Sequence, residues 1–466
     1  MVGALAKALA ADGHEVMIVT PLYRGISEKF GPFKRLDYHL DLVLGDRSVV
    51  GSVQTFAMAP RLDVYFIEQP AFFDRASLYQ QDGNDYSDNA ERFIYFSKAV
   101  AHLARYLPNP PQVVHVHDWQ AGLVPLLIKD QKKNAGWTAA PASCLTIHNL
   151  AYQGFFDAGD FTLTNLPTEY FRPDGVEFYK GLNCLKAAIM YSDMLTTVSP
   201  RYAREITTEI LGCGLDGVLR NRQDALVGIL NGVDYGEWNT TDNKFLRQNY
   251  SIDNLEGKAA DKAALQAELG LPVNHSVPVF GSVTRLAEQK GVDIQLGALE
   301  EMLSTGLQFV LLGSGAPVYE AAYRRLARRL PSRAAIRIGY DHGLAHRIEA
   351  GSDFFLMPSR FEPCGLNQMY SLRYGTIPIV RVTGGLDDSV IDLAENADEA
   401  NGIKFQDYST RALTKAIRKA LIIYADTELH RHLQLNGMAA NFSWETTCKQ
   451  YEDVYLRALE RNRNLP

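Results

Sequence analysis

Short apolar runs recur along most of the chain and alternate with longer amphipathic stretches. The runs are HEVMIVT, VVHVHDW, SCLTIHN, MLTTVS, VGILN, VPVFGSVTR, LQFVLLG, AIRIG, FFLMP and TIPIVRV. Many of them are apolar on both faces, as strands of a parallel sheet are when helices cover both of its sides. The pattern therefore predicts an α/β fold with doubly wound sheets.

The length of the chain predicts two domains. At 466 residues it exceeds what one compact core usually supports, and the rhythm of runs is interrupted by a polar stretch before Asn231. We expect an N-terminal domain over 1–226, a C-terminal domain over 227–443, and a last helix over 444–466 that packs back on the N-terminal domain. Residues 242–272 are polar and are expected to be helical on the way into the second domain.

The first nineteen residues, MVGALAKALAADGHEVMIV, predict a helix, a turn at Asp12-Gly13 and then a strand. An open α/β sheet normally begins with a strand that feeds its first helix. The pattern therefore predicts a structural segment from the first residue onward, with no incoming strand ahead of it.

Composition narrows the class of protein. Hydrophobic residues make up 46% and charged residues 22%, as in a globular protein with a full core, and the formal charge of −7 comes without a basic block that would bind nucleic acid. No apolar run reaches the eighteen or so residues of a membrane span. The five cysteines form no CxxC pair, which favours free thiols in a reducing compartment and predicts a cytoplasmic location.

Two cations follow one of the predicted strands. In VPVFGSVTRLAEQKG the strand ends near Thr284, and Arg285 and Lys290 precede a helix that begins at about Gly291. Cations beside the backbone amides of a helix start can bind a diphosphate. The alternative is that both are ordinary solvated surface charges.

The segment PSRFEPCGLNQ places a carboxylate at the end of the apolar run FFLMP. Glu362 would repel a phosphate, but it can accept hydrogen bonds from a polyhydroxyl group, so a sugar nucleotide suits the segment. Backbone amides of the next helical turn would face the same ligand, from Gly365, Leu366 and Asn367. The alternative is that Glu362 pairs with Arg360 or Arg373 on the surface. A second glycine turn, TGGLDDSV, repeats the strand, loop and helix order from Thr383.

In the first half, polar side chains end two strands. His115 and His117 share one face of VVHVHDW, and Asp118 ends it; His148 ends the run SCLTIHN. An H-x-H pair before a carboxylate could bind a metal, but the strand reads as buried and no third ligand follows, so Asp118 itself is the better functional candidate. Polar strand ends in one half and a phosphate site in the other predict a cleft between two domains.

Together these segments resemble the family of bacterial glycogen synthases and plant starch synthases, from Val2 to about the last helix. The motifs, in the family's order, are HDWQAG, IHNLAYQG, TVSPRYA, GILNGVD, TRLAEQKG, PSRFEPCGLNQ, LRYGTIP and TGGLDDSV. The resemblance implies a GT-B type fold of two Rossmann-like domains facing across a cleft. It also implies transfer of glucose from ADP-glucose to the non-reducing 4-hydroxyl of an α-1,4-glucan, glycogen or starch, with retention of configuration. The plastid is the implied compartment for a plant or algal member.

The resemblance also implies roles for individual residues. Arg285 and Lys290 would hold the distal phosphate and neutralise the leaving ADP, so that no metal or cofactor is required. Glu362 would bond the glucose hydroxyls, His148 would lie over the sugar near its 6-hydroxyl, and Asp118 would line the reaction centre. The remaining donor-binding positions would be Asn231 at the domain junction, Tyr340 stacked on adenine, the backbone amides of Cys364, Gly365 and Leu366, and Asn367, Thr383 and Gly384. At Asn367 the family commonly has other residues.

One departure from the family concerns the start of the chain. Family members begin with a strand and a KxGGLGD-type loop ahead of the stretch that reads VGALAKAL here. We expect the chain as given to be much less active than one with that segment restored, and an incorporation assay on both would test this. Two other functions remain open: a non-catalytic glucan-binding scaffold, and a glycosyltransferase of the same fold that uses UDP-glucose.

Overall fold

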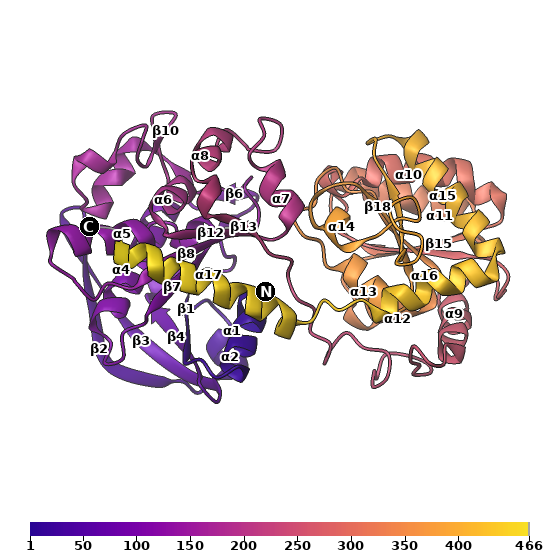
Figure 1. Ribbon diagram of the computed structural model, residues 1–466, viewed down its shortest axis with the longest axis horizontal. Coiled ribbons are helices and arrows are strands. Elements are labelled where there is room, and N and C mark those ends of the chain that lie inside the picture. Colours follow the sequence, from indigo (N-terminus) through magenta and orange to yellow (C-terminus); the bar gives the residue numbers. More distant parts are fainter. Residues whose placement is uncertain (465–466) are drawn as a thin grey trace. The chain divides into compact units, whose positions relative to one another are not determined.

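The computed structural model describes residues 1–464, which form two compact units. The N-terminal unit contains Met1–Val198, Ala203–Ile229 and the last helix, α17 (Trp444–Asn464). The C-terminal unit contains Ser199–Tyr202 and Leu230–Ser443. Each unit combines sheets and helices (Figure 1), so the predicted α/β class is confirmed.

A four-stranded parallel sheet lies at the centre of the N-terminal unit, in the order β13-β12-β8-β7. Its strands are β7 (Val113–His117), β8 (Ala142–Ile147), β12 (Met194–Thr197) and β13 (Leu226–Gly228). Every residue of β8 and β12 is buried, as their apolar sequences require. The helices of this unit include α4 (Asn89–Tyr106), α5 (Val124–Asn134), α6 (Cys184–Tyr191) and α17.

A second sheet of the same unit is mostly antiparallel and was not predicted. It has the order β1-β4-β3-β2, with β1 (Val16–Pro21), β2 (Lys34–Leu44), β3 (Arg47–Ala59) and β4 (Leu62–Glu68). Only β1 and β4 run parallel. The signal was present in β2, where Leu40, Leu42 and Leu44 are buried and alternate with exposed residues, the pattern of a strand with one face in water.

The C-terminal unit is built on a six-stranded parallel sheet in the order β16-β15-β14-β17-β18-β19. The strands are β14 (Val279–Val283), β15 (Gln308–Gly313), β16 (Ala334–Ile338), β17 (Phe354–Met357), β18 (Ile377–Arg381) and β19 (Ile403–Phe405). Numbered along the chain this is the order 3-2-1-4-5-6 of a dinucleotide-binding Rossmann sheet. The direction of winding reverses between β14 and β17.

Two apolar layers cover this sheet. One contains residues of α10 (Val292–Met302), α11 (Pro317–Arg329) and α15 (Thr410–Ala425); the other contains residues of α9 (Glu256–Glu268) and α12 (His342–Gly351). Three further helices complete the unit: α13 (Asn367–Arg373), α14 (Gly384–Ser389) and α16 (Thr427–Ala439).

The expected helix over 242–272 is wrong for its first half. Only α9 is an α-helix there, and residues 242–255 form turns and irregular structure. Asparagine side chains explain the difference: Asn239 Oδ1 accepts from Asp242 N at 2.8 Å, and Asn254 Oδ1 accepts from Glu256 N at 2.9 Å. Such local bonds compete with helix formation.

Both ends of the described chain follow their sequence patterns. The helix α1 (Val2–Ala11) precedes β1 with a turn at Asp12 and Gly13, and α17 is one helix of 21 residues. α17 lies along the parallel sheet of the N-terminal unit and against α1 (Figure 1). Its inward positions Tyr451, Val454 and Ala458 are buried.

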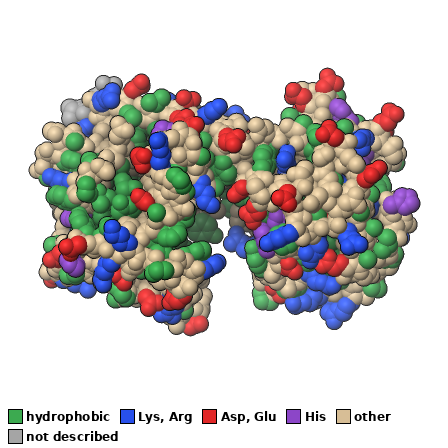
Figure 2. All heavy atoms as spheres, turned by 90° about the horizontal axis from the view of Figure 1, so that it is seen from below, with side chains coloured by type: hydrophobic (Ala, Val, Ile, Leu, Met, Phe, Trp, Pro, Cys, Tyr) green, Lys and Arg blue, Asp and Glu red, His purple; other side chains and the backbone are tan. Residues whose placement is uncertain are grey.

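The surface carries both signs of charge. Figure 2 shows Lys and Arg interspersed with Asp and Glu on each unit. Among the residues that the structure describes, no helix combines the length and the apolar character that crossing a membrane requires.

Candidate functional site

The two cations predicted to bind phosphate lie at the edge of the C-terminal sheet where the direction of winding reverses. Arg285 and Lys290 follow β14, Glu362 follows β17, and these two strands are neighbours. Ligands of open α/β sheets bind outside the carboxyl ends of the strands at such a reversal. The residues that the sequence singled out in this half therefore gather at one edge of one sheet.

Lys290 and Glu362 form an ion pair. Lys290 Nζ donates to Glu362 Oε2 at 2.6 Å, and Ser359 Oγ donates to the same oxygen at 3.0 Å. Glu362 is only 6% exposed. The two loops can come this close because Gly291 has φ +70° and no side chain; a Cβ there would lie 1.9 Å from the carbonyl oxygen of Pro358.

The alternative of a surface pair with a nearby arginine is wrong. Arg360 pairs with Glu288 at 2.8 Å, and the guanidinium of Arg373 lies 4.6 Å from the ring centroid of Tyr235. Glu362 thus takes its positive partner from the loop after β14.

Arg285 stands at the same edge and is exposed. Its Nη2 donates to Gln289 Oε1 at 3.3 Å, and Gln289 Nε2 lies 3.5 Å from the Phe361 carbonyl oxygen. This contact orients the guanidinium toward the loop after β17. An exposed guanidinium can still offer a paired set of donors to a phosphate.

The glycine turn after β18 packs directly on the loop that carries Glu362. Gly384 has φ +43°, and a Cβ on it would lie 2.0 Å from the Glu362 carbonyl oxygen; a Cβ on Gly385 would lie 2.2 Å from that of Cys364. Thr383, which precedes the turn, is buried, and Gly365 adopts φ +71°. Only glycine permits these approaches, so the two loops form one unit of structure.

Cys364 is a structural thiol. Burial raises its pKa to about 12, although hydrogen bonds from Asn231 act in the opposite direction. The thiol therefore stays protonated, and a nucleophilic role, which needs the thiolate, does not fit it.

The other predicted donor-binding residues also belong to the C-terminal unit. Asn231 Oδ1 is buried and, among residues 1–464, has no hydrogen-bond partner. Asn367 begins α13 after Leu366, and its Nδ2 donates to the Val283 carbonyl at 2.6 Å. Tyr340 follows β16 and is 89% exposed. The side chain of Asn367 is thus fixed on β14, which the sequence did not indicate.

In the N-terminal unit, Asp118 and His148 follow the neighbouring strands β7 and β8. Asp118 Oδ1 accepts from the backbone N–H of His148 at 2.7 Å. Asp118 has φ +54° and ψ −161°, a conformation that costs a residue with a side chain about 1–3 kcal/mol. Burial raises its pKa to about 6, although the amides of His148 and Asn149 lower it.

The histidines of this unit form a chain of contacts. His117 Nδ1 lies 3.1 Å from His148 Nε2, a partnership that the sequence analysis missed. His115 uses both ring nitrogens, with Tyr455 Oη at 2.9 Å and Thr146 Oγ1 at 2.6 Å. Because both ring nitrogens of His115 contact hydroxyl groups, neither is free to bind a metal. A metal site at the H-x-H pair is therefore not supported.

Acidification is expected to destabilise the N-terminal unit through these histidines. Burial lowers the pKa of His115 to about 3 and that of His148 to about 4, whereas an unfolded histidine titrates at about 6.5. Between pH 6.5 and 4 the unfolded chain binds protons that the folded unit does not. The free energy of unfolding therefore decreases as the pH decreases, by about 1 kcal/mol per pH unit for each histidine.

Asp118 works in the opposite direction below pH 6, because its raised pKa means that the folded unit takes up a proton before the unfolded chain does. Thermal unfolding of the parent and of His148→Asn from pH 4.5 to 7.5 measures how the stability depends on pH and how much of that dependence comes from His148. The variant should show the flatter dependence, and identical slopes would contradict the assignment.

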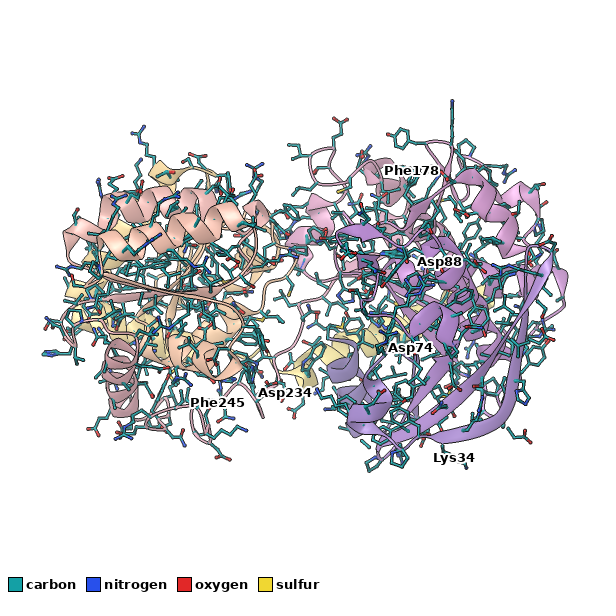
Figure 3. All side chains as sticks on the ribbon, turned by 180° about the vertical axis from the view of Figure 1, so that it is seen from behind. Lys34, Asp74, Asp88, Phe178, Asp234 and Phe245 are labelled. Carbon is teal, nitrogen blue, oxygen red and sulfur yellow. The ribbon has the colours of Figure 1, made fainter. Side chains whose placement is uncertain are left out.

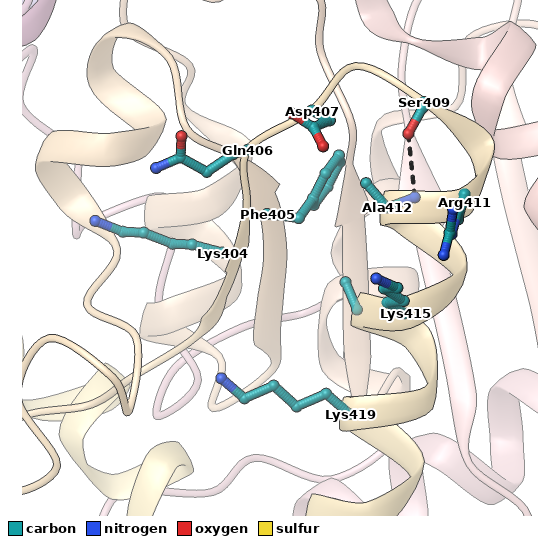
Figure 4. Close-up of a pocket in the computed structure, with 10 residues that line it drawn as sticks. Lys404, Phe405, Gln406, Asp407, Ser409, Arg411, Ala412, Lys415 and Lys419 are labelled. Carbon is teal, nitrogen blue, oxygen red and sulfur yellow. Dashed lines mark hydrogen bonds between the residues drawn. The ribbon is translucent and has the colours of Figure 1, made fainter.

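A pocket elsewhere in the C-terminal unit contains none of the predicted site residues. It lies between the end of β19 and the start of α15, where Ser409 Oγ accepts from Ala412 N at 3.2 Å (Figure 4). Two of its four cations are paired: Lys419 with Asp392 at 2.7 Å and Lys404 with Asp387 at 2.9 Å. Because its lining residues come from β19, α15 and the residues between them, the pocket is separate from the edge at β14 and β17.

The fold and the edge at β14 and β17 are those of a glycosyltransferase with two Rossmann-like units. The family model described as starch synthase catalytic domain matches residues 1–221, and the one described as glycosyl transferases group 1 matches residues 270–437. The chain belongs to the family of glycogen synthases and starch synthases, as the resemblance implied.

Relatives match over almost the whole length. A glycogen synthase of Anaeromyxobacter sp. (strain Fw109-5) is 48% identical over 97% of this chain and 94% of its own, and one of Koribacter versatilis is 44% identical over 100% and 96%. The solved catalytic domain of starch synthase IV from Arabidopsis thaliana, bound to ADP and acarbose, is 34% identical, with TM-score 0.88 over 98% of this chain and 95% of that one.

Proposed function

We propose that the protein transfers glucose from ADP-glucose to the non-reducing 4-hydroxyl of an α-1,4-glucan. The observation that carries this proposal is the pairing of Lys290 with Glu362 at the reversal point of a Rossmann sheet. The similar starch synthase IV structure, which holds ADP and acarbose, supports a diphosphate and a sugar chain as the ligands.

Charge accounts for the two partners. When ADP leaves, negative charge develops on its distal phosphate while positive charge grows on the anomeric carbon. Lys290 and Arg285 would stabilise the phosphate, and Glu362 would accept hydrogen bonds from the glucose hydroxyls. Before the donor arrives, Lys290 neutralises the buried carboxylate; with donor bound, its ammonium would be shared between the carboxylate and the phosphate.

The remaining donor contacts come from the same unit. The first turn of α13 has no side-chain cap, and the N–H groups of Met369 and Tyr370 donate to the Leu366 carbonyl. The backbone N–H groups of Gly365, Leu366 and Asn367 would meet the phosphates. The buried Asn231 Oδ1, which has no hydrogen-bond partner among the described residues, can accept a hydrogen bond from a hydroxyl or amine of the donor. The exposed ring of Tyr340 provides a face on which adenine would stack.

Asp118 would line the reaction centre, and His148 would lie over the glucose near its 6-hydroxyl. The backbone of Asp118 is strained, and its N–H donates to the Thr146 carbonyl while its Oδ1 accepts from His148 N. Strain of this kind is common at functional sites. His148 is neutral near pH 7, because burial lowers its pKa to about 4, so it can hydrogen-bond a sugar hydroxyl without carrying charge.

We propose a same-face displacement for the chemical step. The bond from the anomeric carbon to the phosphate oxygen breaks while the acceptor 4-oxygen bonds to that carbon on the same face, and the acceptor's proton passes to the departing phosphate oxygen. This keeps the configuration without a protein nucleophile, and the protonated Cys364 is consistent with it. Trapping of a glucosyl-enzyme intermediate would refute it.

The donor is tested by incorporation of labelled glucose into glycogen from ADP-glucose and from UDP-glucose. We expect ADP-glucose to be preferred by about tenfold or more in kcat/KM, that is, by about 1.4 kcal/mol. Initial rates are measured with each nucleotide sugar as the sole glucose donor.

Glu362→Gln separates catalysis from binding in the same assay. The variant keeps a hydrogen-bonding side chain, so it should still bind ADP in a calorimetric titration while losing transfer. Preference for UDP-glucose would favour the other donor, and ADP binding by the parent without transfer would favour the scaffold. The bacterial origin of the relatives supports our proposal of a cytoplasmic location.

A further inference from the structure

Three metal-binding side chains converge in the C-terminal unit, away from the Lys290 and Glu362 pair in sequence. His342 and His346 are four residues apart on α12 and so lie on one face of the helix. Glu237 reaches them from the segment between Asp234 and Phe245, both labelled in Figure 3. His346 is fully buried, whereas the side chains of His342 and Glu237 are 38% and 50% exposed.

The separations of the three atoms fit one shared ion. His342 Nε2 lies 3.1 Å from Glu237 Oε1 and 3.3 Å from His346 Nε2, and all three atoms lie within 4.8 Å of one another. Zn²⁺ binds histidine nitrogen and carboxylate oxygen at about 2.0–2.2 Å in a tetrahedron, whose edges are then about 3.3 Å long. The two measured contacts are edges of that length.

Hydrogen bonds alone do not satisfy both contacts of His342 Nε2. His342 Nε2 lies within reach of both Glu237 Oε1 and His346 Nε2, and a single proton on it satisfies one of the two contacts. A proton on His342 Nε2 can serve Glu237 or face His346, but not both. A divalent cation accepts all three lone pairs at once.

Surrounding side chains fix the inner histidine. The ring of His346 is stacked on Trp238 at 4.1 Å and on Phe245 at 4.9 Å. Its Nδ1 lies 2.8 Å from Tyr374 Oη and 3.2 Å from Asn243 Nδ2. A proton on Nδ1, donated to Tyr374 Oη, leaves the lone pair of Nε2 for an ion, and such an outer partner orients a metal-binding imidazole.

We propose that Glu237, His342 and His346 bind a Zn²⁺ ion, with water as the fourth ligand. Two imidazoles and one carboxylate are ligands that zinc favours, and the exposed side of the site gives both ion and water access. The ion would join the irregular segment at the start of the unit to α12. Trp238, next to Glu237, is stacked on Tyr370 of α13 at 3.8 Å, so the joined segment also supports the helix that follows Glu362.

The test begins with the full chain stripped of metal by a chelator. Titration with ZnCl₂ against a chromophoric competitor should show one site, and saturating Zn²⁺ should raise the midpoint of thermal unfolding by about 5 °C. His342→Ala and Glu237→Gln, both at partly exposed positions, should each weaken Zn²⁺ binding at least tenfold. His275→Ala, an exposed histidine of the same unit, is the matched control and should bind like the parent.

A second group of side chains in the N-terminal unit requires its own variant. Ligand atoms of Asp12, Cys448 and Glu452 also lie within 4.8 Å of one another, so the titration is repeated with Cys448→Ser. Co²⁺ gives the two sites different spectra, because only a thiolate adds an intense sulfur-to-metal band. We expect a visible spectrum without that band, unchanged in Cys448→Ser and lost in His342→Ala.

Three results would overturn the proposal. These are no binding by the stripped parent, undiminished binding by both His342→Ala and Glu237→Gln, or binding that disappears in Cys448→Ser alone. Thermal unfolding of each variant in chelator establishes that it is folded before binding is compared.

Discussion

The double variant Arg285→Ala/Lys290→Ala is expected to lower kcat/KM for glucosyl transfer by about 10⁴-fold or more. Each preorganised donor to a developing anion contributes about 10²–10³-fold. Loss of Lys290 also leaves the carboxylate of Glu362, 6% exposed, without its partner at 2.6 Å. A buried charge that loses its partner is strongly destabilising, so ADP binding should weaken as well.

Initial rates with ADP-glucose and glycogen, together with calorimetric titration of ADP, measure both effects. Arg325→Ala removes an exposed cation of α11 in the same unit and should leave rates and affinity unchanged. If the double variant transfers glucose at the parental rate, the assigned role of both cations is wrong.

Gly384→Ala is expected to abolish ADP binding and to destabilise the C-terminal unit by about 2–5 kcal/mol. Two costs combine at this position. Alanine is strained at φ +43°, and its Cβ would lie 2.0 Å from the Glu362 carbonyl oxygen. Because the Cβ is held rigidly by its own backbone and its partner in the clash is a backbone oxygen, relief would have to move the loop that holds Glu362 beside Lys290.

Gly270→Ala separates the two costs. Gly270 has φ +74°, and a Cβ added there would meet no atom within 4 Å, so alanine suffers the backbone strain alone. Urea unfolding and ADP titration of both variants should show about 1 kcal/mol of destabilisation and normal ADP affinity for Gly270→Ala. Similar losses in the two variants would show that the close contact at Gly384 is unimportant.

The sequence predicted the parallel sheets because their strands are apolar on both faces, a pattern typical of parallel strands that helices cover on both sides. It did not predict the antiparallel sheet, since β2 and β3 mix buried and exposed residues and contain several charges. It also extended a helix through residues 242–255. Helix-compatible composition there is overridden by asparagine side chains that bond to nearby backbone N–H groups.

The sequence could predict those residues of the candidate site that directly follow a predicted strand. In a parallel sheet, residues that follow neighbouring strands meet at one edge, which locates Arg285, Lys290 and Glu362 without any structure. Their pairing was not predictable, because Lys290 and Glu362 are 72 residues apart and depend on the close approach at Gly291. The left-handed backbone of Asp118 likewise leaves no mark in the sequence.

The N-terminal unit is assembled from three stretches of chain, and the last of them is α17. During synthesis, the parallel sheet of this unit emerges first, yet the helix that buries Tyr451, Val454 and Ala458 beside it arrives more than two hundred residues later. The C-terminal unit is complete by Ser443 and can finish folding earlier. On the ribosome, the half that is made first is therefore the half that is finished last, and its apolar surface is the one that chaperones would need to shield.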